Sequence, residues 1–237
     1  MADFMTSHFW LAVAQLVMID ILLGGDNAVV IALACRRLPA EQRFKGIMWG
    51  TAGAILLRVV LIVFALTLLQ VPWLKLVGAL LLLWIGIKLI VPSADDAHEG
   101  MIQSSEHLWA AVRTIILADL VMSIDNVIAI AGVAQTSHED HQLVLVTLGL
   151  LISIPIIIWG SQLVLRMMDR FPIIVLLGGM LLGWIAGTMA PTDPMVAAHY
   201  PQDTLWIYAA GLAGALFVLG LGYVLRRRQQ KRMLVAH

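Results

Sequence analysis

Charged residues are scarce in this sequence, and cysteine is almost absent from it. Asp, Glu, Lys and Arg together make up 13% of the 237 residues, which is about half the share found in ordinary globular proteins. A soluble protein of this length needs more charge to cover its surface, so the composition argues against one. Cys35 is the only cysteine, which excludes a small secreted fold held together by disulfides. No polar tract dominates the chain, and this excludes a disordered protein.

Long apolar runs are what the sequence contains instead. Hydrophobic residues account for 61% of the chain, and they gather in runs that are each near or above the ~20 residues that a helix needs to cross a bilayer. Because lipid offers no partners to backbone amides, each run predicts a transmembrane helix. We therefore expect an all-α membrane protein with seven transmembrane helices, in contact with the lipid bilayer. The seven runs are Phe9–Ala34, Gly46–Leu69, Trp73–Val91, Leu108–Ala134, Leu143–Leu165, Pro172–Met189 and Leu205–Leu225.

The positions of Lys and Arg predict the orientation of these helices. Apart from Arg58 and Lys75, every Lys and Arg lies in or beside the links after the first, third and fifth runs, or in the tail Arg226–Arg232. Seven alternating spans would place these segments on one side of the membrane, which the positive-inside rule assigns to the cytoplasm. We therefore expect the N-terminus outside and the C-terminus in the cytoplasm. The basic tail abuts a membrane span, so it is interpreted as an anchor for anionic lipids, and no nucleic-acid partner is expected.

Two pairs of segments indicate an internal repeat. Asp20–Leu33 matches Asp119–Gly132 in five of 14 positions, and Pro72–Gly86 matches Pro172–Ala186 in seven of 15, at offsets of 99 and 100. Because each unit has three spans, the second unit enters the membrane from the opposite side. This predicts an inverted three-plus-three repeat followed by one C-terminal helix. The expected units are residues 1–92 and 108–190, with a cytoplasmic linker at 93–107 and a seventh helix and basic tail at 191–237.

Four aspartates and two asparagines inside the apolar runs are the strongest functional signal. An acidic side chain in the middle of a membrane costs ~2.5–3.5 kcal/mol, so protons, internal cations or a bound metal ion must neutralise this group. The donors are all oxygen atoms, with no Cys or His among them, and this favours Mn²⁺, Mg²⁺ or Ca²⁺ over Zn²⁺. Aspartates that only hold helices together are an alternative. The six residues are Asp20, Asp26, Asn27, Asp119, Asp125 and Asn126.

The spacing within the first of these segments predicts a break in its helix. Asp20 and Asp26 lie ~120° apart on a straight helix, so both can reach one ion only if the helix is locally unwound. Gly24-Gly25 offers such a break, although a role in close helix packing is the alternative. Arg58, midway along the second run, is expected to be the counter-ion of one aspartate rather than a partner of backbone carbonyls.

The segments D-I-L-L-G-G-D-N-A-V-V-I-A-L and A-D-L-V-M-S-I-D-N-V-I-A-I-A-G resemble the paired signature segments of the TerC family of integral membrane proteins, within the LysE-like transporter superfamily. The resemblance extends over nearly the whole chain. It implies an inverted three-plus-three repeat in the bacterial plasma (inner) membrane, and the export of manganese. It also implies that the metal site consists of Asp20, Asp26, Asn27, Asp119, Asp125 and Asn126.

Together, the residues and the resemblance predict a multi-pass transporter of divalent cations, with manganese(II) efflux as its function and protons as a candidate coupling ion. No enzyme is expected, because the motifs H-E-x-x-H and G-x-S-x-G are both absent. Two alternatives stay open: an accessory membrane protein that delivers metal to other machinery, and an intramembrane enzyme that uses the aspartates or a metal. A homo-oligomer also stays open. The outer link His138–His141 is expected to be a solvated loop, with a role in collecting cations as the alternative.

Overall fold

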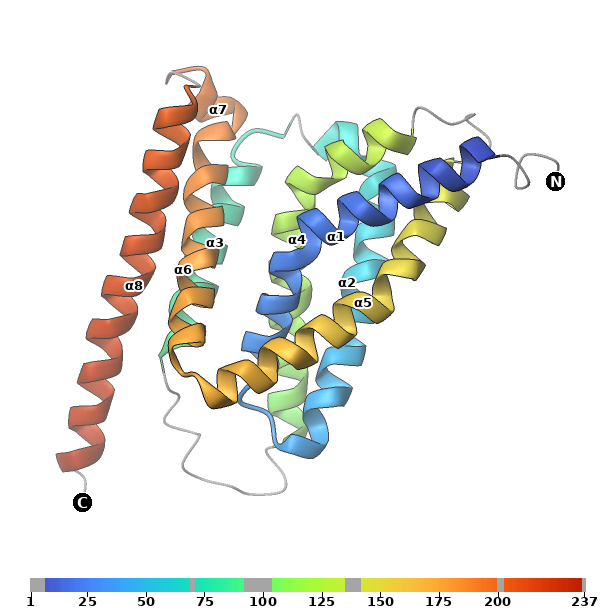
Figure 1. The fold of residues 1–237 in the computed structure, drawn as a ribbon. Helices are drawn as coiled ribbons and strands as arrows, with labels where there is room; N and C mark the ends of the chain where they lie inside the picture. Colours follow the sequence, from blue (N-terminus) through green and yellow to red (C-terminus); the bar gives the residue numbers. More distant parts are fainter. Residues whose placement is uncertain (1–6, 69–70, 92–103, 135–141, 200–202, 236–237) are drawn as a thin grey trace.

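In a computed structural model, the chain forms a bundle of α-helices (Figure 1). The structure describes residues 7–68, 71–91, 104–134, 142–199 and 203–235. Every regular element within these ranges is helical, which confirms the all-α prediction. The elements are α1 (Ser7–Cys35), α2 (Ala40–Leu68), α3 (Leu74–Ile90), α4 (Ser104–Ala134), α5 (Gln142–Arg170), α6 (Ile173–Met189), the 3₁₀ helix η4 (Ala190–Thr192), α7 (Pro194–Ala197) and α8 (Thr204–Val235).

Several of these helices are long and apolar enough to cross a membrane. Among the described residues, five segments meet that condition by length and composition. Helix α3 has 17 residues, a length of roughly 26 Å, which is slightly short of the ~30 Å hydrocarbon layer. In α1, the segment Gly25–Cys35 is a shorter apolar helix. The five segments are Ala40–Leu61, Glu106–Ile124, Leu151–Arg170, Ile173–Thr192 and Thr204–Arg228.

Two of the most extensive helix contacts join helices that are far apart in the chain. Helix α1 packs along α5, and α2 packs along α4, so the two predicted repeat units are interleaved rather than separate. Helix α3 packs against α6, and α8 lies along α6 on the side away from α1 and α5 (Figure 1). Helix α4 begins at Ser104, inside the segment that was expected to be a linker.

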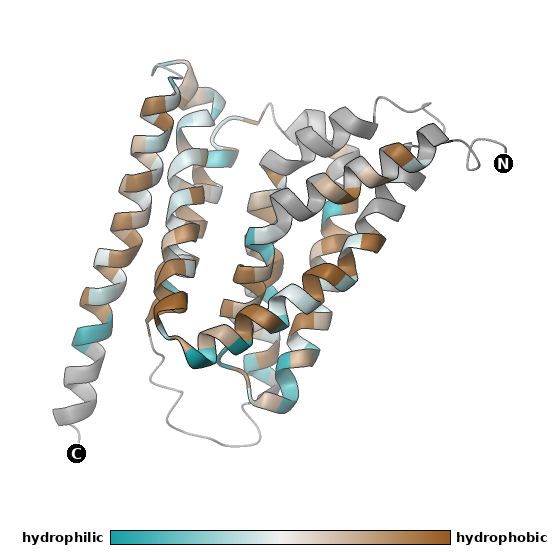
Figure 2. Ribbon diagram, in the orientation of Figure 1, coloured by the Kyte–Doolittle hydropathy of each residue, from teal (hydrophilic) through white to brown (hydrophobic). Residues whose placement is uncertain are grey.

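The exterior of the bundle is as apolar as its interior. Leu33, Leu82 and Leu182 are completely or almost completely buried, whereas Trp159 and Leu205 are 68% and 82% exposed. Figure 2 shows hydrophobic residues along the described lengths of α5, α6 and α8. Apolar surface of this extent is unfavourable in water but suits the hydrocarbon of a bilayer, in which helices satisfy their own backbone groups.

Both ends of the short helix α3 are held by charged side chains from other segments. At its N-terminus, Asp193 accepts hydrogen bonds from the backbone N–H groups of Trp73 and Leu76, at 3.2 and 3.3 Å. The same carboxylate caps α7 by accepting from the N–H of Met195 at 3.0 Å. At the C-terminus of α3, the guanidinium of Arg37 donates to three carbonyl oxygens. These belong to Lys88, Leu89 and Val91. An anion at the N-terminus and a cation at the C-terminus both oppose the helix dipole favourably.

The caps on α3 have two local consequences. Trp73 has a φ of 68°, the only positive φ of a non-glycine residue in the described chain. This strained turn is held in place by the bond to Asp193. Burial of the Asp193 carboxylate acts to raise its pKa, but the N–H donors from Met195, Trp73, Leu76 and Lys75 together lower the pKa below its ordinary value.

Small residues allow α6 and α8 to approach each other closely. A Cβ atom on Gly183 would lie 2.5 Å from the carbonyl oxygen of Gly214, and one on Gly187 would overlap the carbonyl of Ala210. Earlier in the chain, a Cβ on Gly50 would overlap the side chain of Ile115, where α2 meets α4. Glycine at these positions therefore has a packing role, as small residues commonly have in membrane helices.

The predicted break in the first helix is wrong. Helix α1 continues through Gly24-Gly25 from Ser7 to Cys35 as a single α-helix, although Figure 1 shows that its axis changes direction along its length. Two glycines cost a helix only ~1 kcal/mol each, and the buried segment Val30–Cys35 anchors the helix in the core. The alternative role in packing is not visible for Gly25, because a Cβ there would meet nothing within 4 Å.

Candidate functional site

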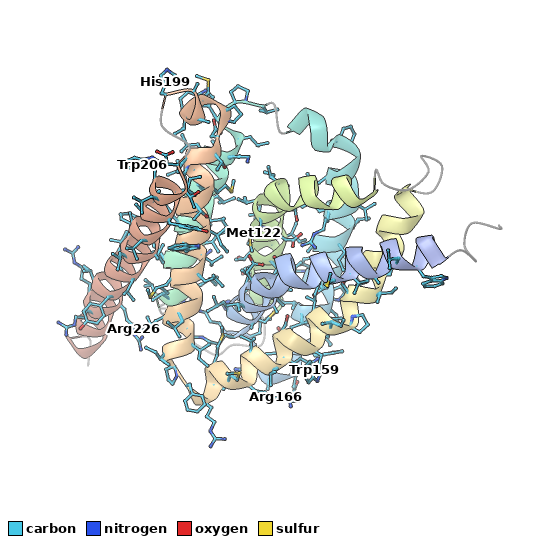
Figure 3. The ribbon with its side chains drawn as sticks, turned by 45° about the horizontal axis from the view of Figure 1, so that its top comes forward. Met122, Trp159, Arg166, His199, Trp206 and Arg226 are labelled. Carbon is cyan, nitrogen blue, oxygen red and sulfur yellow. The ribbon has the colours of Figure 1, made fainter. Side chains whose placement is uncertain are left out.

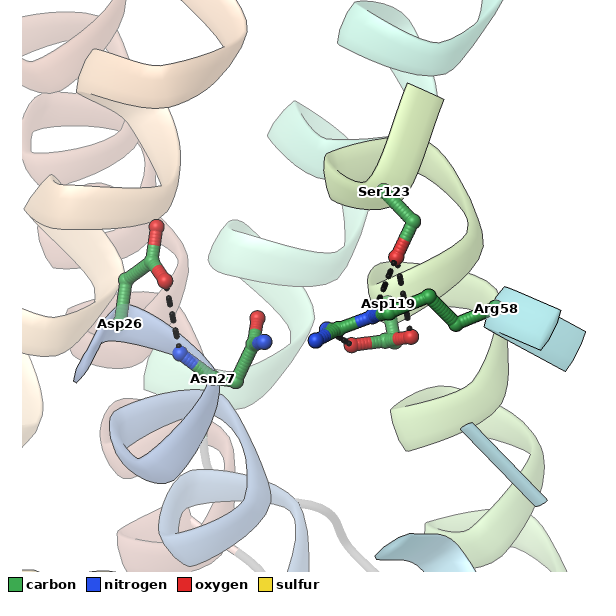
Figure 4. A network of polar contacts seen from close by, with 5 residues as sticks. All are labelled: Asp26, Asn27, Arg58, Asp119 and Ser123. Carbon is green, nitrogen blue, oxygen red and sulfur yellow. Dashed lines mark hydrogen bonds and ion pairs between the residues drawn. The ribbon is translucent and has the colours of Figure 1, made fainter. Parts of the chain in front are cut away.

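A buried ion pair joins α2 to α4. Asp119 and Ser123 lie one turn apart on α4 and therefore share a face, and α2 packs along this helix. Nη2 of Arg58 lies 2.6 Å from Oδ1 of Asp119, with side-chain exposures of 3% and 7%. Nε of Arg58 donates to Oγ of Ser123 at 3.2 Å, and this hydroxyl donates to Oδ2 of Asp119 at 3.1 Å (Figure 4). The prediction that Arg58 is the counter-ion of an aspartate is confirmed.

The three side chains form a closed ring in which every charge is compensated. Both carboxylate oxygens of Asp119 accept a hydrogen bond, one from Arg58 and one from Ser123. A guanidinium keeps its charge at any physiological pH. Taking two charges out of water is costly, and a buried pair is stable only when its remaining donors and acceptors are also satisfied. The Ser123 hydroxyl meets that condition by bridging the two partners.

The opposite wall of the site is formed by α1, and one buried carboxamide on it has no hydrogen-bond partner among the described residues. Asn27 is only 4% exposed, yet neither its Nδ2 nor its Oδ1 has a hydrogen-bond partner among the described residues. In Figure 4 its carboxamide points toward the Arg58–Asp119 pair. A buried polar group without a partner costs ~1–3 kcal/mol, and such groups are rare enough in folded proteins to require an explanation. A bound ligand is one such explanation.

Asp26 belongs to the same site as Asn27. Its Oδ1 accepts a hydrogen bond from the backbone N–H of Asn27 at 2.9 Å, and Figure 4 draws it across the site from the Arg58–Asp119 pair. Among the described side chains, the site holds one guanidinium and two carboxylates, which leaves one negative charge in excess when both are ionised. This excess attracts a cation and disfavours an anionic substrate.

One buried polar residue on α2 was not singled out from the sequence. The Oγ1 atom of Thr51 on α2 is buried and has no hydrogen-bond partner in the described part of the chain. Thr51 precedes Arg58 by seven residues, and two turns of helix place both on one face. That spacing is the signal by which the sequence could have revealed it. The capping role of Asp193 was also missed, although the Asp-Pro pair that it forms with Pro194 is typical of a helix start.

The structure describes only part of the predicted metal site. It brings together Asp26, Asn27 and Asp119, from two segments that are far apart in the sequence. The side chains of Asp20, Asp125 and Asn126 lie outside the described residues, as does the link His138–His141. Among the side chains that are described, no group of three or more His, Cys, Asp or Glu could hold a metal ion. The six-residue ligand set therefore stays a prediction.

Comparison with known proteins gives related membrane proteins. The family model of the integral membrane protein TerC family matches residues 5–231. The chain is 42% identical to the uncharacterized membrane protein YjbE of Bacillus subtilis over 205 residues, which cover 85% of this chain and 90% of YjbE. It is 26% identical to YceF of the same organism, over 96% of this chain and 87% of YceF. The inner membrane protein YgdQ of Escherichia coli is 25% identical, over 71% and 75% of the two chains. No solved structure matches the chain.

Proposed function

This chain belongs to the integral membrane protein TerC family, and from that premise we propose that it transports a divalent cation, manganese(II), out of the cytoplasm across the bacterial plasma membrane. The observation that carries the proposal is the unsatisfied carboxamide of Asn27. It is buried, it faces the Arg58–Asp119 pair, and it lies beside Asp26. A site with oxygen donors and excess negative charge suits a hard divalent cation such as Mn²⁺, with Mg²⁺ and Ca²⁺ as the other candidates.

The proposed architecture is an inverted three-plus-three repeat with seven spans. Packing of α1 on α5 and of α2 on α4 supports it, because a two-fold exchange of α1–α3 with α4–α6 turns one contact into the other. In such transporters the substrate site lies where the two repeats meet, near the middle of the membrane. The Arg58–Asp119 pair connects one helix of each unit, so its position agrees with this arrangement.

The proposed orientation has the C-terminus in the cytoplasm. Figure 1 places the link between α1 and α2, the turn between α5 and α6, and the C-terminal end of α8 at one end of the bundle, with α7 at the other. In Figure 3, Arg166 and Arg226 lie toward the first end and His199 lies at the second. Concentration of basic residues at one end supports a cytoplasmic assignment for that end.

In the proposed site, α1 and α4 provide the cation ligands, and protons are the coupling ion. Asp26 and Asn27 offer two side-chain oxygen donors from α1, and Asp119 stands across the site on α4. The repeat adds a second Asp-Asn pair on α4 and an aspartate on α1. The full proposed set is Asp20, Asp26, Asn27, Asp119, Asp125 and Asn126. Binding of a 2+ ion to several carboxylates displaces protons from them, which gives a physical route for coupling to a proton gradient.

A flux assay with purified protein tests this proposal. Proteoliposomes containing a manganese-sensitive dye should show Mn²⁺ movement across the bilayer. The double variant Asp26→Asn/Asp125→Asn should lower the rate about tenfold or more. Asp169→Asn is the matched control, because Asp169 is 47% exposed and pairs with Arg43 at the surface. Flux that survives the double variant contradicts the proposed site. Metal binding without any flux in the wild type contradicts transport and supports the accessory role instead.

A further inference from the structure

We propose that Arg58 is a tethered cation that occupies Asp119 when the transported ion is absent and is displaced from it when the ion binds. This inference rests on the proposed transport function and adds a step to it. Its starting point is the contrast between the two walls of the site. On α4 every polar atom of Asp119 has a donor, whereas on α1 the carboxamide of Asn27 has no described partner.

The guanidinium of Arg58 already contacts Asp119, which is one of the predicted metal ligands. Arg58 lies 2.6 Å from Asp119, as close as any ion pair makes contact, and both side chains are buried. A metal ion bound to the same carboxylate oxygen would lie close to the guanidinium, and the two positive charges would repel each other. A metal ion that uses Asp119 as a ligand must therefore compete with the guanidinium. Because Arg58 cannot lose its proton, the competition is settled by movement of the side chain rather than by titration.

The internal cation is present in only one of the two repeat units. The offset that relates the D-N segments makes Asp20 the counterpart of Asp119. The same offset of 99 or 100 assigns Ile157 or Ile158 to the place of Arg58. No basic residue therefore replaces Arg58 in the second unit. This asymmetry indicates a function that one copy can perform, and pairing with Asp119 in the empty site is such a function.

A tethered cation has a specific consequence for a carrier. After releasing its ion, a carrier must reorient empty, and an unpaired buried carboxylate would oppose that step because of its desolvation cost. Arg58 removes this cost by pairing with Asp119 in the empty state. Arg58 is not needed during exchange, because the carrier then holds a metal ion at the site in both of its reorientation steps. Net efflux therefore requires Arg58, whereas one-for-one exchange of metal across the membrane does not.

The test compares these two kinds of flux in the full-length protein in proteoliposomes. Net efflux is measured from vesicles loaded with Mn²⁺ into metal-free buffer, and exchange is measured with labelled Mn²⁺ on one side and unlabelled Mn²⁺ on the other. Arg58→Gln should lower net efflux about tenfold or more, and should leave exchange within about twofold of the wild type. Binding of Mn²⁺ to the purified protein should tighten, because a competing positive charge has been removed.

Two variants serve as comparisons. Arg58→Lys keeps a positive charge and should restore much of the net efflux. Arg43→Gln removes another arginine from α2 that also lies 2.6 Å from an aspartate, but at the surface, with side-chain exposures of 26% and 47%. It should change neither flux nor binding. If Arg58→Gln does not fold, Ser123→Ala provides the measurement, because it removes one bond that holds Arg58 but keeps both charges. Like Arg58→Gln, Ser123→Ala should tighten Mn²⁺ binding and lower the ratio of net efflux to exchange, but by a smaller factor.

The possible outcomes distinguish the inference from the proposed function. Equal losses of exchange and net efflux in folded Arg58→Gln would overturn the inference, because they indicate a structural role. Unimpaired net efflux in that variant would also overturn it, as would unchanged binding and fluxes in Ser123→Ala. If the wild type shows neither exchange nor net efflux, it is the proposed transport function that fails.

Discussion

Replacing Asn27 with leucine should make the metal-free protein more stable and less responsive to metal. Leucine has the same number and branching of side-chain heavy atoms as asparagine and brings no polar atoms, so Asn27→Leu removes both unpartnered atoms of a side chain that is only 4% exposed. A buried polar group without a partner costs ~1–3 kcal/mol. The metal-free variant should therefore gain about that much in its free energy of unfolding. For a chain of this size each ~1 kcal/mol corresponds to a rise of ~2–4 °C in Tm.

Addition of Mn²⁺ should stabilise the wild type much more than the Asn27→Leu variant. At a concentration of 100 times Kd, a ligand that binds only the folded state stabilises it by ~2.7 kcal/mol. The wild type in detergent should gain a corresponding rise in Tm on addition of Mn²⁺, and Asn27→Leu should lose most of it. The assay is thermal unfolding followed by tryptophan fluorescence, with and without Mn²⁺.

A buried hydroxyl with a satisfied bond provides the control for this prediction. Ser161 is completely buried and donates to the carbonyl oxygen of Ile157 at 2.7 Å. Ser161→Ala should therefore not raise Tm, and its response to Mn²⁺ should equal that of the wild type. The reasoning is refuted if Asn27→Leu lowers the Tm of the metal-free protein, or if the Mn²⁺ response survives in it.

Three further predictions concern a helix cap, a close helix contact and the buried ion pair. Asp193→Ala removes the carboxylate that caps α3 and α7, and it should lower the free energy of unfolding by ~2–3 kcal/mol, measured by chemical denaturation. Asp203→Ala is the control and should have little effect, because Asp203 caps α8 through its backbone carbonyl. The folded-state pKa of Asp193 is lowered, so its contribution to the free energy of unfolding should be complete above the unfolded pKa of ~3.9 and should be lost as pH falls through the folded pKa. The difference in stability between the wild type and Asp193→Ala should therefore shrink on acidification, and a difference that stays constant would contradict this. Gly183→Leu should separate α8 from α6 and reduce the yield of monodisperse protein. Arg58→Gln alone should cost ~3–5 kcal/mol by leaving a buried charge, and adding Asp119→Asn should recover part of that loss in a double-mutant cycle; purely additive costs would mean that the pair is not coupled.

The helical class and the main polar residues could be predicted because they depend on local patterns. Each apolar run is itself the reason for a helix in lipid, so the positions of α2, α4, α5, α6 and α8 follow from composition alone. Asp26, Asn27 and Asp119 stood out because polar residues inside such runs are rare and costly. The pairing of Arg58 with some aspartate could be predicted in the same way, since a buried charge requires a counter-ion.

The partner of Arg58 could not be predicted in the same way. Asp119 lies 61 residues further along the chain. From the sequence, several aspartates were equally plausible partners of the guanidinium. The choice depends on the packing of α2 along α4, which places Arg58 opposite the face shared by Asp119 and Ser123. The expected break at Gly24-Gly25 was wrong for a related reason, because weak local propensities yield to tertiary packing.

The sequence by itself determined that this protein is a bundle of apolar helices with a rare acidic motif that occurs twice. Hydrophobic burial and backbone hydrogen bonding in lipid depend on runs of neighbouring residues, which the sequence displays directly. Only the tertiary structure decided that Asp119 is closed in a ring with Arg58 and Ser123 while Asn27 is left without a described partner. Hydrogen bonds act over about 3 Å, so their partners are chosen by how distant helices pack and not by their order along the chain.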